Sequence, residues 1–145
     1  YGLDDPIVDD TPGVFTNTFL GDLYTQLIAQ GSLSEVDALA VGAYIEDRDI
    51  ADLRSALTEV ECPCVVRVFE NLEAGSCNHL RAFVKLLTAQ GETYTPEFLT
   101  QDEFDAILNV PQGGPQGNQF QHRYLQDQAQ PQPMKRQRAR NWYGQ

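Results

Sequence analysis

Two long amphipathic stretches, joined by a short linker that contains a proline, constrain the fold of this chain more than any other feature of the sequence. Residues 35–59 and 65–89 repeat apolar side chains every three or four positions, which is the spacing of one face of an α-helix. Because linker 60–64 is short and contains Pro63, we expect the two helices to fold back antiparallel with these faces together. The first face contains Val36, Leu39, Ala43, Glu46, Asp49, Ile50, Leu53 and Leu57, and the second contains Val65, Phe69, Leu72, Ser76, His79, Phe83 and Leu87.

Two potential metal ligands, Glu46 and His79, lie in the middle of these otherwise apolar faces, and Asp49 follows Glu46 by about one helical turn. Facing helices would bring Glu46 and His79 to a similar depth. Carboxylate and imidazole groups suit iron or another transition metal, so Glu46, Asp49 and His79 form a candidate metal site. The alternative is a buried hydrogen-bond network in which Arg48 or Arg81 balances the carboxylates, and a single histidine without a second strong ligand more often marks such a network.

Two shorter helices complete the predicted architecture. Residues 14–30 have an amphipathic pattern, and Ser34 is a suitable N-cap for the long helix that begins at Glu35. Residues 100–109 form a fourth helix that Thr100 opens. The sequence therefore predicts an all-α fold with four helices.

These elements divide the chain into three parts. Residues 1–13 contain four Asp and two Pro and form an extended acidic arm. Residues 14–110 fold as a small four-helix bundle. From residue 111 to residue 145 the composition shifts to Gln, Gly and Pro, which indicates a low-complexity tail.

Charge separates an acidic body from this basic tail. Residues 1–110 hold 20 Asp and Glu against 5 Lys and Arg, a net charge of −15, whereas residues 111–145 hold 1 against 5, a net charge of +4. An acidic body repels nucleic acid and anionic lipid, and no apolar run of about 20 residues could span a membrane. We expect the tail to bind an acidic protein surface, its own or that of a second copy in a homo-oligomer, through Arg136, Arg138, Arg140, Trp142 and Tyr143.

The three cysteines, Cys62, Cys64 and Cys77, are an odd number, so one of them cannot pair within the chain. Cys64 and Cys77 lie 13 residues apart on one predicted helix, about 20 Å, which is too far for a disulfide. Because Glu73 and Arg81 flank Cys77 on its own face, we expect its sulfur to point toward solvent or a neighbouring subunit, where a bridge to Cys62 or Cys64 would form. The alternatives are a Cys62–Cys64 pair with Cys77 reduced, or three reduced thiols.

A family resemblance rests on three strings in the helical body: EVDALAVGAYIEDRDIADL at 35–53, GSCNHLRAF at 75–83 and YTPEFLTQDEFDAI at 94–107. In order and spacing they resemble the ferritin-like family catalogued as domain of unknown function 2202. The resemblance covers about half of the chain and implies a ferritin-like helical bundle, without an established reaction. The positions that match the family's pattern are Glu46, Asp49, Asn78, His79 and Arg81.

Ferritin-like di-metal sites use a Glu on each of two helices and two Glu-x-x-His pairs on the others. This chain departs from that pattern, because Ser76 stands three residues before His79 and the second histidine, His122, belongs to the tail. We therefore do not expect a complete di-iron site within one chain. A reduced site of Glu46, Asp49 and His79, or a site shared by two chains, is compatible with the sequence.

These observations favour a secreted or cell-surface structural protein that assembles with itself through its tail. Tyr1 in place of Met suggests removal of a leader sequence. No nucleophile turn, glycine-rich phosphate loop or zinc spacing indicates an enzyme, so we assign no catalytic or cofactor-binding residue. The alternative function is a metal-binding or metal-oxidising ferritin-like protein that uses Glu46, Asp49 and His79.

Overall fold

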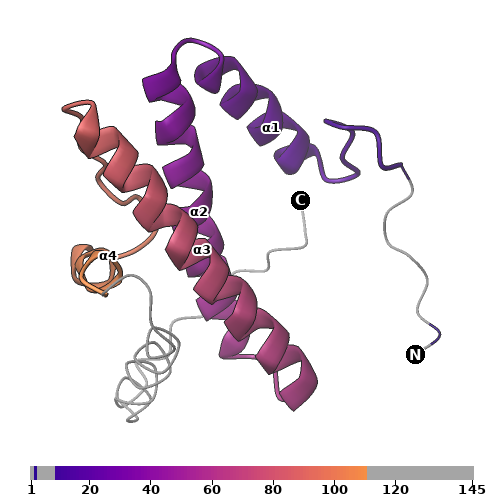
Figure 1. Cartoon of the computed structure of the whole chain (residues 1–145). Helices are drawn as coiled ribbons and strands as arrows, with labels where there is room; N and C mark the ends of the chain where they lie inside the picture. The colour runs from indigo at the N-terminus through magenta and orange to yellow at the C-terminus, as the bar shows by residue number, and fades with distance from the viewer. Residues whose placement is uncertain (1, 3–8, 111–145) are drawn as a thin grey trace. The chain divides into compact units, whose positions relative to one another are not determined.

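The amphipathic pattern of the sequence folds into helices only. The computed structural model describes Gly2 and residues 9–110, and within them it contains four α-helices and no strand. The predicted all-α fold is therefore confirmed for this part of the chain, and all four helices belong to the unit Tyr1–Asn109. The helices are α1 (Thr18–Gly31), α2 (Glu35–Leu57), α3 (Pro63–Ala89) and α4 (Gln101–Leu108) (Figure 1).

The predicted N-caps of α2 and α4 both form. The Ser34 hydroxyl accepts a hydrogen bond from the backbone N–H of Asp37 at 3.0 Å. Thr100 and Glu103 form a capping box, in which each side chain accepts a hydrogen bond from the other residue's backbone N–H. Each cap satisfies N–H groups that the first turn of a helix leaves without a partner.

Two helix starts differ from those expected. α1 begins at Thr18 and not at residue 14, because the side chain of Asn17 accepts from the N–H of Leu20 and so caps the helix there. α3 begins at Pro63, which was assigned to the linker. Proline suits the first position of a helix, where its missing N–H costs nothing and its φ is already helical.

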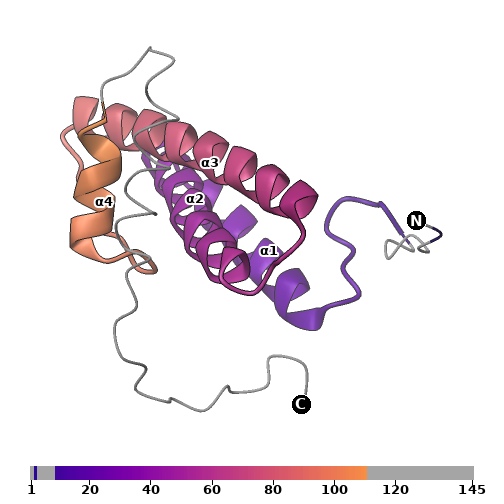
Figure 2. The ribbon, with the colours of Figure 1, turned by 90° about the horizontal axis from the view of Figure 1, so that it is seen from below.

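The long helices α2 and α3 run in opposite directions and pack against each other, as both ribbon views show (Figures 1 and 2). The antiparallel pairing predicted from the short linker is confirmed. The apolar core between α2 and α3 also includes residues of α4 and of the loop before it. The α2–α3 pair therefore positions that loop. The buried apolar residues are Ala43, Ile50, Cys77, Leu80, Leu87, Leu99, Phe104 and Ile107.

α1 and α4 lie on this pair very differently. α4 packs on α3 and buries Phe104 and Ile107, whereas α1 packs on α2 without burying a single residue. None of the helices in the described residues is long and apolar enough to cross a membrane. Among the four helices of the described residues, α1 is thus the one that buries its apolar side chains least.

Gly42 of α2 lies directly against the ring of Phe83 on α3. A Cβ added at this position would lie 2.5 Å from Cε1 of Phe83, a distance that packed atoms do not adopt. Gly75, in the interior of α3, has no atom within 4 Å of an added Cβ. The two glycines therefore separate the effect of close packing from the effect of helix propensity.

We expect Gly42→Ala to lower the free energy of unfolding by about 1–3 kcal/mol, because the Phe83 ring must shift within a packed interface. The matched control Gly75→Ala should raise it by about 0.5–1 kcal/mol, since alanine favours a helix interior over glycine. Urea denaturation of both variants measures the difference. Equal effects of the two substitutions would contradict the close approach.

Candidate functional site

Glu46 of α2 and His79 of α3 lie side by side. Nδ1 of His79 is 3.2 Å from Oε1 of Glu46, so the predicted proximity of these two residues is confirmed. Their predicted burial is wrong for the histidine, whose side chain is 65% exposed, while that of Glu46 is 16% exposed. The pair is a hydrogen-bonded contact at the margin of the helix interface and does not belong to the core.

Asp49 does not join this pair. Its Oδ2 accepts a hydrogen bond from the Ser76 hydroxyl at 3.1 Å. The arginines expected to balance the carboxylates are engaged elsewhere: Arg48 forms an ion pair with Asp52 at 3.5 Å, and Arg81 donates to a backbone carbonyl of α4 at 3.1 Å. In the described part of the chain, no three His, Cys, Asp or Glu side chains are placed so that they could hold a metal ion.

Ser76 is buried as predicted, whereas the buried carboxylates are those of Asp47, one residue after Glu46, and Glu73, which the predicted faces do not include. The buried positions are Ala43, Asp47 and Ile50 on α2, and Glu73, Ser76, Cys77, Leu80 and Leu87 on α3. These positions still follow the three-or-four spacing of one helical face. His79 lies about 100° around the helix from Leu80, which explains its exposure.

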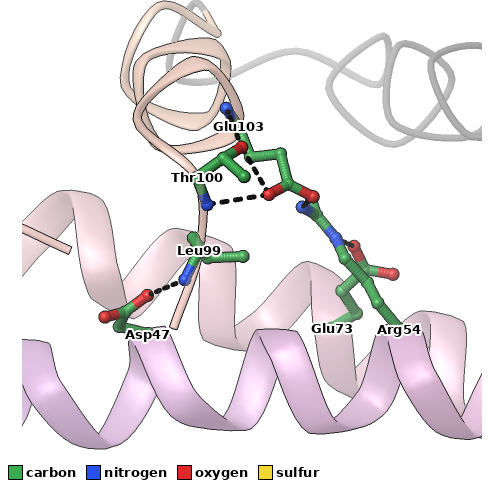
Figure 3. A network of polar contacts seen from close by, with 6 residues as sticks. All are labelled: Asp47, Arg54, Glu73, Leu99, Thr100 and Glu103. Atoms are coloured by element: carbon green, nitrogen blue, oxygen red, sulfur yellow. Dashed lines mark hydrogen bonds and ion pairs between the residues drawn. The ribbon is translucent and has the colours of Figure 1, made fainter. Parts of the chain in front are cut away.

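The fully buried carboxylate of Asp47 holds the loop that leads into α4. Its Oδ2 accepts from the backbone N–H groups of Glu97 at 2.7 Å and Phe98 at 3.2 Å. Its Oδ1 accepts from the backbone N–H of Leu99 at 3.0 Å (Figure 3). The Tyr94 hydroxyl also donates to Oδ2, at 2.9 Å. Burial, with this bond to Asp47, raises the pKa of Tyr94, so its proton stays in place. A buried carboxylate is tolerated when donors surround it in this way.

A second polar cluster, formed by Arg54, Glu73 and Glu103, joins α2, α3 and α4 (Figure 3). Arg54 donates through Nε to Glu73 at 2.8 Å and through Nη1 to Glu103 at 3.1 Å. Burial lowers the pKa of Arg54, but Glu73 and then Glu103 raise it above its ordinary value. For Glu103 burial acts to raise the pKa. The hydrogen bonds from Thr100 and Arg54 outweigh burial, so the pKa of Glu103 is lowered below its ordinary value. Arg54 and Glu103 are therefore both charged at neutral pH.

Cys62 and Cys64 form a disulfide at the start of α3, and both residues are exposed. This is one of the alternatives that the sequence leaves open. Cys77 is 0% exposed, so the expectation that its sulfur points toward solvent or a neighbouring subunit is wrong. The inference failed because Glu73 does not face water: it is buried with Cys77, next to Arg54 of α2. A bridge from Cys77 to another subunit is incompatible with this packing.

One side of α1 presents a row of exposed apolar residues. We call Phe19, Leu20, Tyr24 and Ile28 the α1 face, and their exposed fractions lie between 37% and 54%. At about 100° per residue these four positions spread over about half of the helix circumference, and neither α2 nor Phe15, whose ring lies 5.7 Å from that of Tyr24, covers them fully. Single exposed apolar residues need no explanation, but several on one helix make the α1 face a candidate interaction surface.

Arg48 connects the α1 face to the rest of the unit. Its guanidinium carbon lies 5.0 Å from the centre of the Phe19 ring and 5.2 Å from that of Phe98. Cation–π contacts of this kind hold the start of α1 on the middle of α2, beside the loop that Asp47 organises. α1 is therefore held in place while its outer apolar side chains stay exposed.

The residues predicted to dock the tail lie outside the described residues, and docking stays a prediction. They are Arg136, Arg138, Arg140, Trp142 and Tyr143. The same holds for His122 and for most of the acidic arm. The charge contrast between the two parts follows from the sequence alone.

Comparison with known proteins places residues 1–111 in a family whose description is "Uncharacterized protein domain (DUF2202)". The uncharacterized protein MJ0754 of Methanocaldococcus jannaschii is 44% identical over 109 residues, which are 75% of this chain and 59% of that protein. The crystal structure of hypothetical protein MJ0754 from Methanococcus jannaschii matches with a TM-score of 0.73 at 42% identity, covering 77% of this chain and 63% of the other. The chain thus spans less than two thirds of the relative that it matches.

We expect Asp47→Asn to lower the free energy of unfolding by about 2–4 kcal/mol. The two oxygens of Asp47 accept four hydrogen bonds, and in asparagine an NH₂ group, which cannot accept, replaces one of these oxygens. The matched control Asp52→Asn removes only an exposed i,i+4 ion pair and should cost less than about 1 kcal/mol. Chemical denaturation measures both. A loss for Asp47→Asn no larger than that of the control would contradict the role of this carboxylate.

Proposed function

The chain belongs to the DUF2202 family, and from this premise we propose that it is a structural subunit that assembles with further copies of itself. The observation that supports the proposal most is the α1 face. Four large apolar side chains on one helix stay exposed, although α1 is itself packed on α2. Exposed sets of this kind are characteristic of surfaces that a partner covers.

The partner we propose for the α1 face is the basic tail, residues 111–145, of a second copy. The tail has a net charge of +4 and the rest of the chain one of −15, so tail and body of different copies attract each other. The tail also contains five large side chains suited to an apolar surface: Phe120, Tyr124, Leu125, Trp142 and Tyr143. Charge would bring the tail to the acidic unit, and these side chains would cover the α1 face.

Two further parts of the proposal concern location and fold. An exposed disulfide is favoured by oxidising compartments, which supports a secreted or cell-surface protein. The antiparallel pair of 23-residue α2 and 27-residue α3 has the form of the long helix pair in ferritin-like bundles, which supports a ferritin-like assignment.

One contact favours a second candidate function, metal binding. Glu46 and His79 present a carboxylate and an imidazole 3.2 Å apart, and the histidine is accessible to a solvated ion. Two protein ligands are too few for a stable site in one chain. Two copies related by a twofold axis would supply four, so this function also depends on assembly.

Deleting residues 112–145 should convert the assembled protein into single chains. Each of these is smaller than the intact 16.2 kDa chain by the mass of the deleted segment. Light scattering of the intact and shortened proteins measures the change. The double variant Leu20→Lys and Ile28→Lys should have the same effect, because it places two cations in the path of a basic tail.

The matched control for this experiment is Leu86→Lys, which changes a residue of α3 that is 50% exposed and lies outside the α1 face. It should leave the mass unchanged, and reductant should also leave it unchanged because Cys77 is buried. A shortened protein that still assembles would contradict the tail as the partner. An intact protein that remains a single chain would contradict self-assembly itself.

For the second function, calorimetric titration of the intact chain with Zn²⁺ should give one ion per two chains, and His79→Ala should abolish the binding. The control Asn71→Ala changes an exposed residue on the same helix and should leave the binding intact. Binding that survives His79→Ala, or a chain that binds no zinc, would contradict a site at Glu46 and His79.

A further inference from the structure

The disulfide between Cys62 and Cys64 has an unusual place in the molecule. Its two cysteines are separated by Pro63 alone, and both are exposed where the linker enters α3. Neither belongs to the apolar core that holds α2, α3 and α4 together. The sulfurs are therefore accessible to other molecules, whereas the third sulfur, that of Cys77, is 0% exposed.

A bond of this span contributes little to the stability of the fold. A disulfide stabilises mainly by restricting the unfolded chain, and the effect grows with the length of the loop that it closes. A sequence separation of 2 is close to the smallest loop that two cysteines can close. The linker direction is already fixed by Pro63 at the first position of α3, so reduction would leave the helix pair intact.

The position of the two cysteines favours their thiolates. Cys62 is the N-cap of a 27-residue helix and Cys64 belongs to its first turn, with no side chain bound to the cap N–H groups. The N-terminal end of a helix has a partial positive charge, which lowers the pKa of thiols there. Arg67, one turn further along from Cys64, adds a positive charge, while Glu61 beside Cys62 opposes it. A stabilised reduced form makes the corresponding disulfide a stronger oxidant.

We propose that Cys62 and Cys64 form a thiol–disulfide exchange site that oxidises dithiols. A thiolate of the substrate attacks Sγ of Cys64, so that a new S–S bond forms and the Cys62–Cys64 bond breaks. Cys62 leaves as a thiolate at the N-cap, where the helix end stabilises it. This site is independent of the self-assembly proposed above.

The second half of the exchange completes the transfer of two electrons. The remaining substrate thiolate attacks the substrate sulfur of the mixed disulfide and releases Cys64 as a thiolate. The substrate ends as a disulfide, and Cys62 and Cys64 end as thiols with the two protons that the substrate gave up. One turnover needs no other oxidant, because the Cys62–Cys64 bond is itself the electron acceptor.

The first experiment follows oxidation of a reduced peptide with two cysteines by the intact chain. We expect at least about a tenfold faster rate than with oxidised glutathione at equal concentration, since the leaving thiolate is stabilised. Reduced glutathione replaces the peptide in a second arm, which distinguishes a small-molecule thiol from a peptide dithiol. Cys77 should remain unreacted in peptide-resolved alkylation, because the folded chain buries it.

Two variants and one stability measurement complete the test. Cys62→Ser and Cys64→Ser should each abolish oxidation of the peptide, because neither variant can form the Cys62–Cys64 bond that accepts the two electrons. Reduction of the native chain should leave its helicity and melting temperature unchanged. A rate no faster than that of oxidised glutathione, or a melting temperature that falls on reduction, would overturn the proposal and make the bond a structural one.

Discussion

The buried carboxylate of Asp47 is the interaction on which the second half of the fold depends. A charge with no exposed surface is stable only when donors surround it, and here three backbone N–H groups and the Tyr94 hydroxyl do so. These donors all come from the segment between α3 and α4. Asp47 thus converts an irregular loop into a fixed support, from which Thr100 can begin α4. Arg54, bonded to Glu73 and Glu103, fixes the same helix from the other direction.

The first and last helices of the unit, α1 and α4, therefore differ in how far their side chains are buried and paired. Around α4, polar groups pair with one another, Phe104 and Ile107 are buried, and no large apolar side chain of the helix itself is exposed. Around α1, the helix packs on α2 with Arg48 over the Phe19 ring, while the outer apolar residues stay exposed. Because the cost of exposed apolar surface is recovered only by covering it, we place the proposed association at α1.

Helix positions followed from the sequence because their signals are local. Ser34 and Thr100 cap helices through contacts three residues away. The register of the buried faces followed only in part, because the sequence predicts Glu46 and His79 on these faces, whereas the buried carboxylates are those of Asp47 and Glu73. Asp47 and Glu73 are spaced correctly for burial, at four residues from Ala43 and from Cys77, yet only distant partners in the fold make burial favourable. Those partners, the loop N–H groups and Arg54, are not visible in a helical pattern.

The proposed assembly surface and the proposed exchange site are compatible with each other because α2 separates them. The α1 face begins where Phe19 meets Arg48, while the disulfide lies beyond the end of α2 at Leu57. From Arg48 to Leu57 the helix advances about 13 Å, more than the reach of a side chain. A partner that covers α1 therefore need not cover Cys62 and Cys64. Burial of Cys77 within the same helix pair keeps the third sulfur from competing, so exposure assigns different roles to three chemically identical groups.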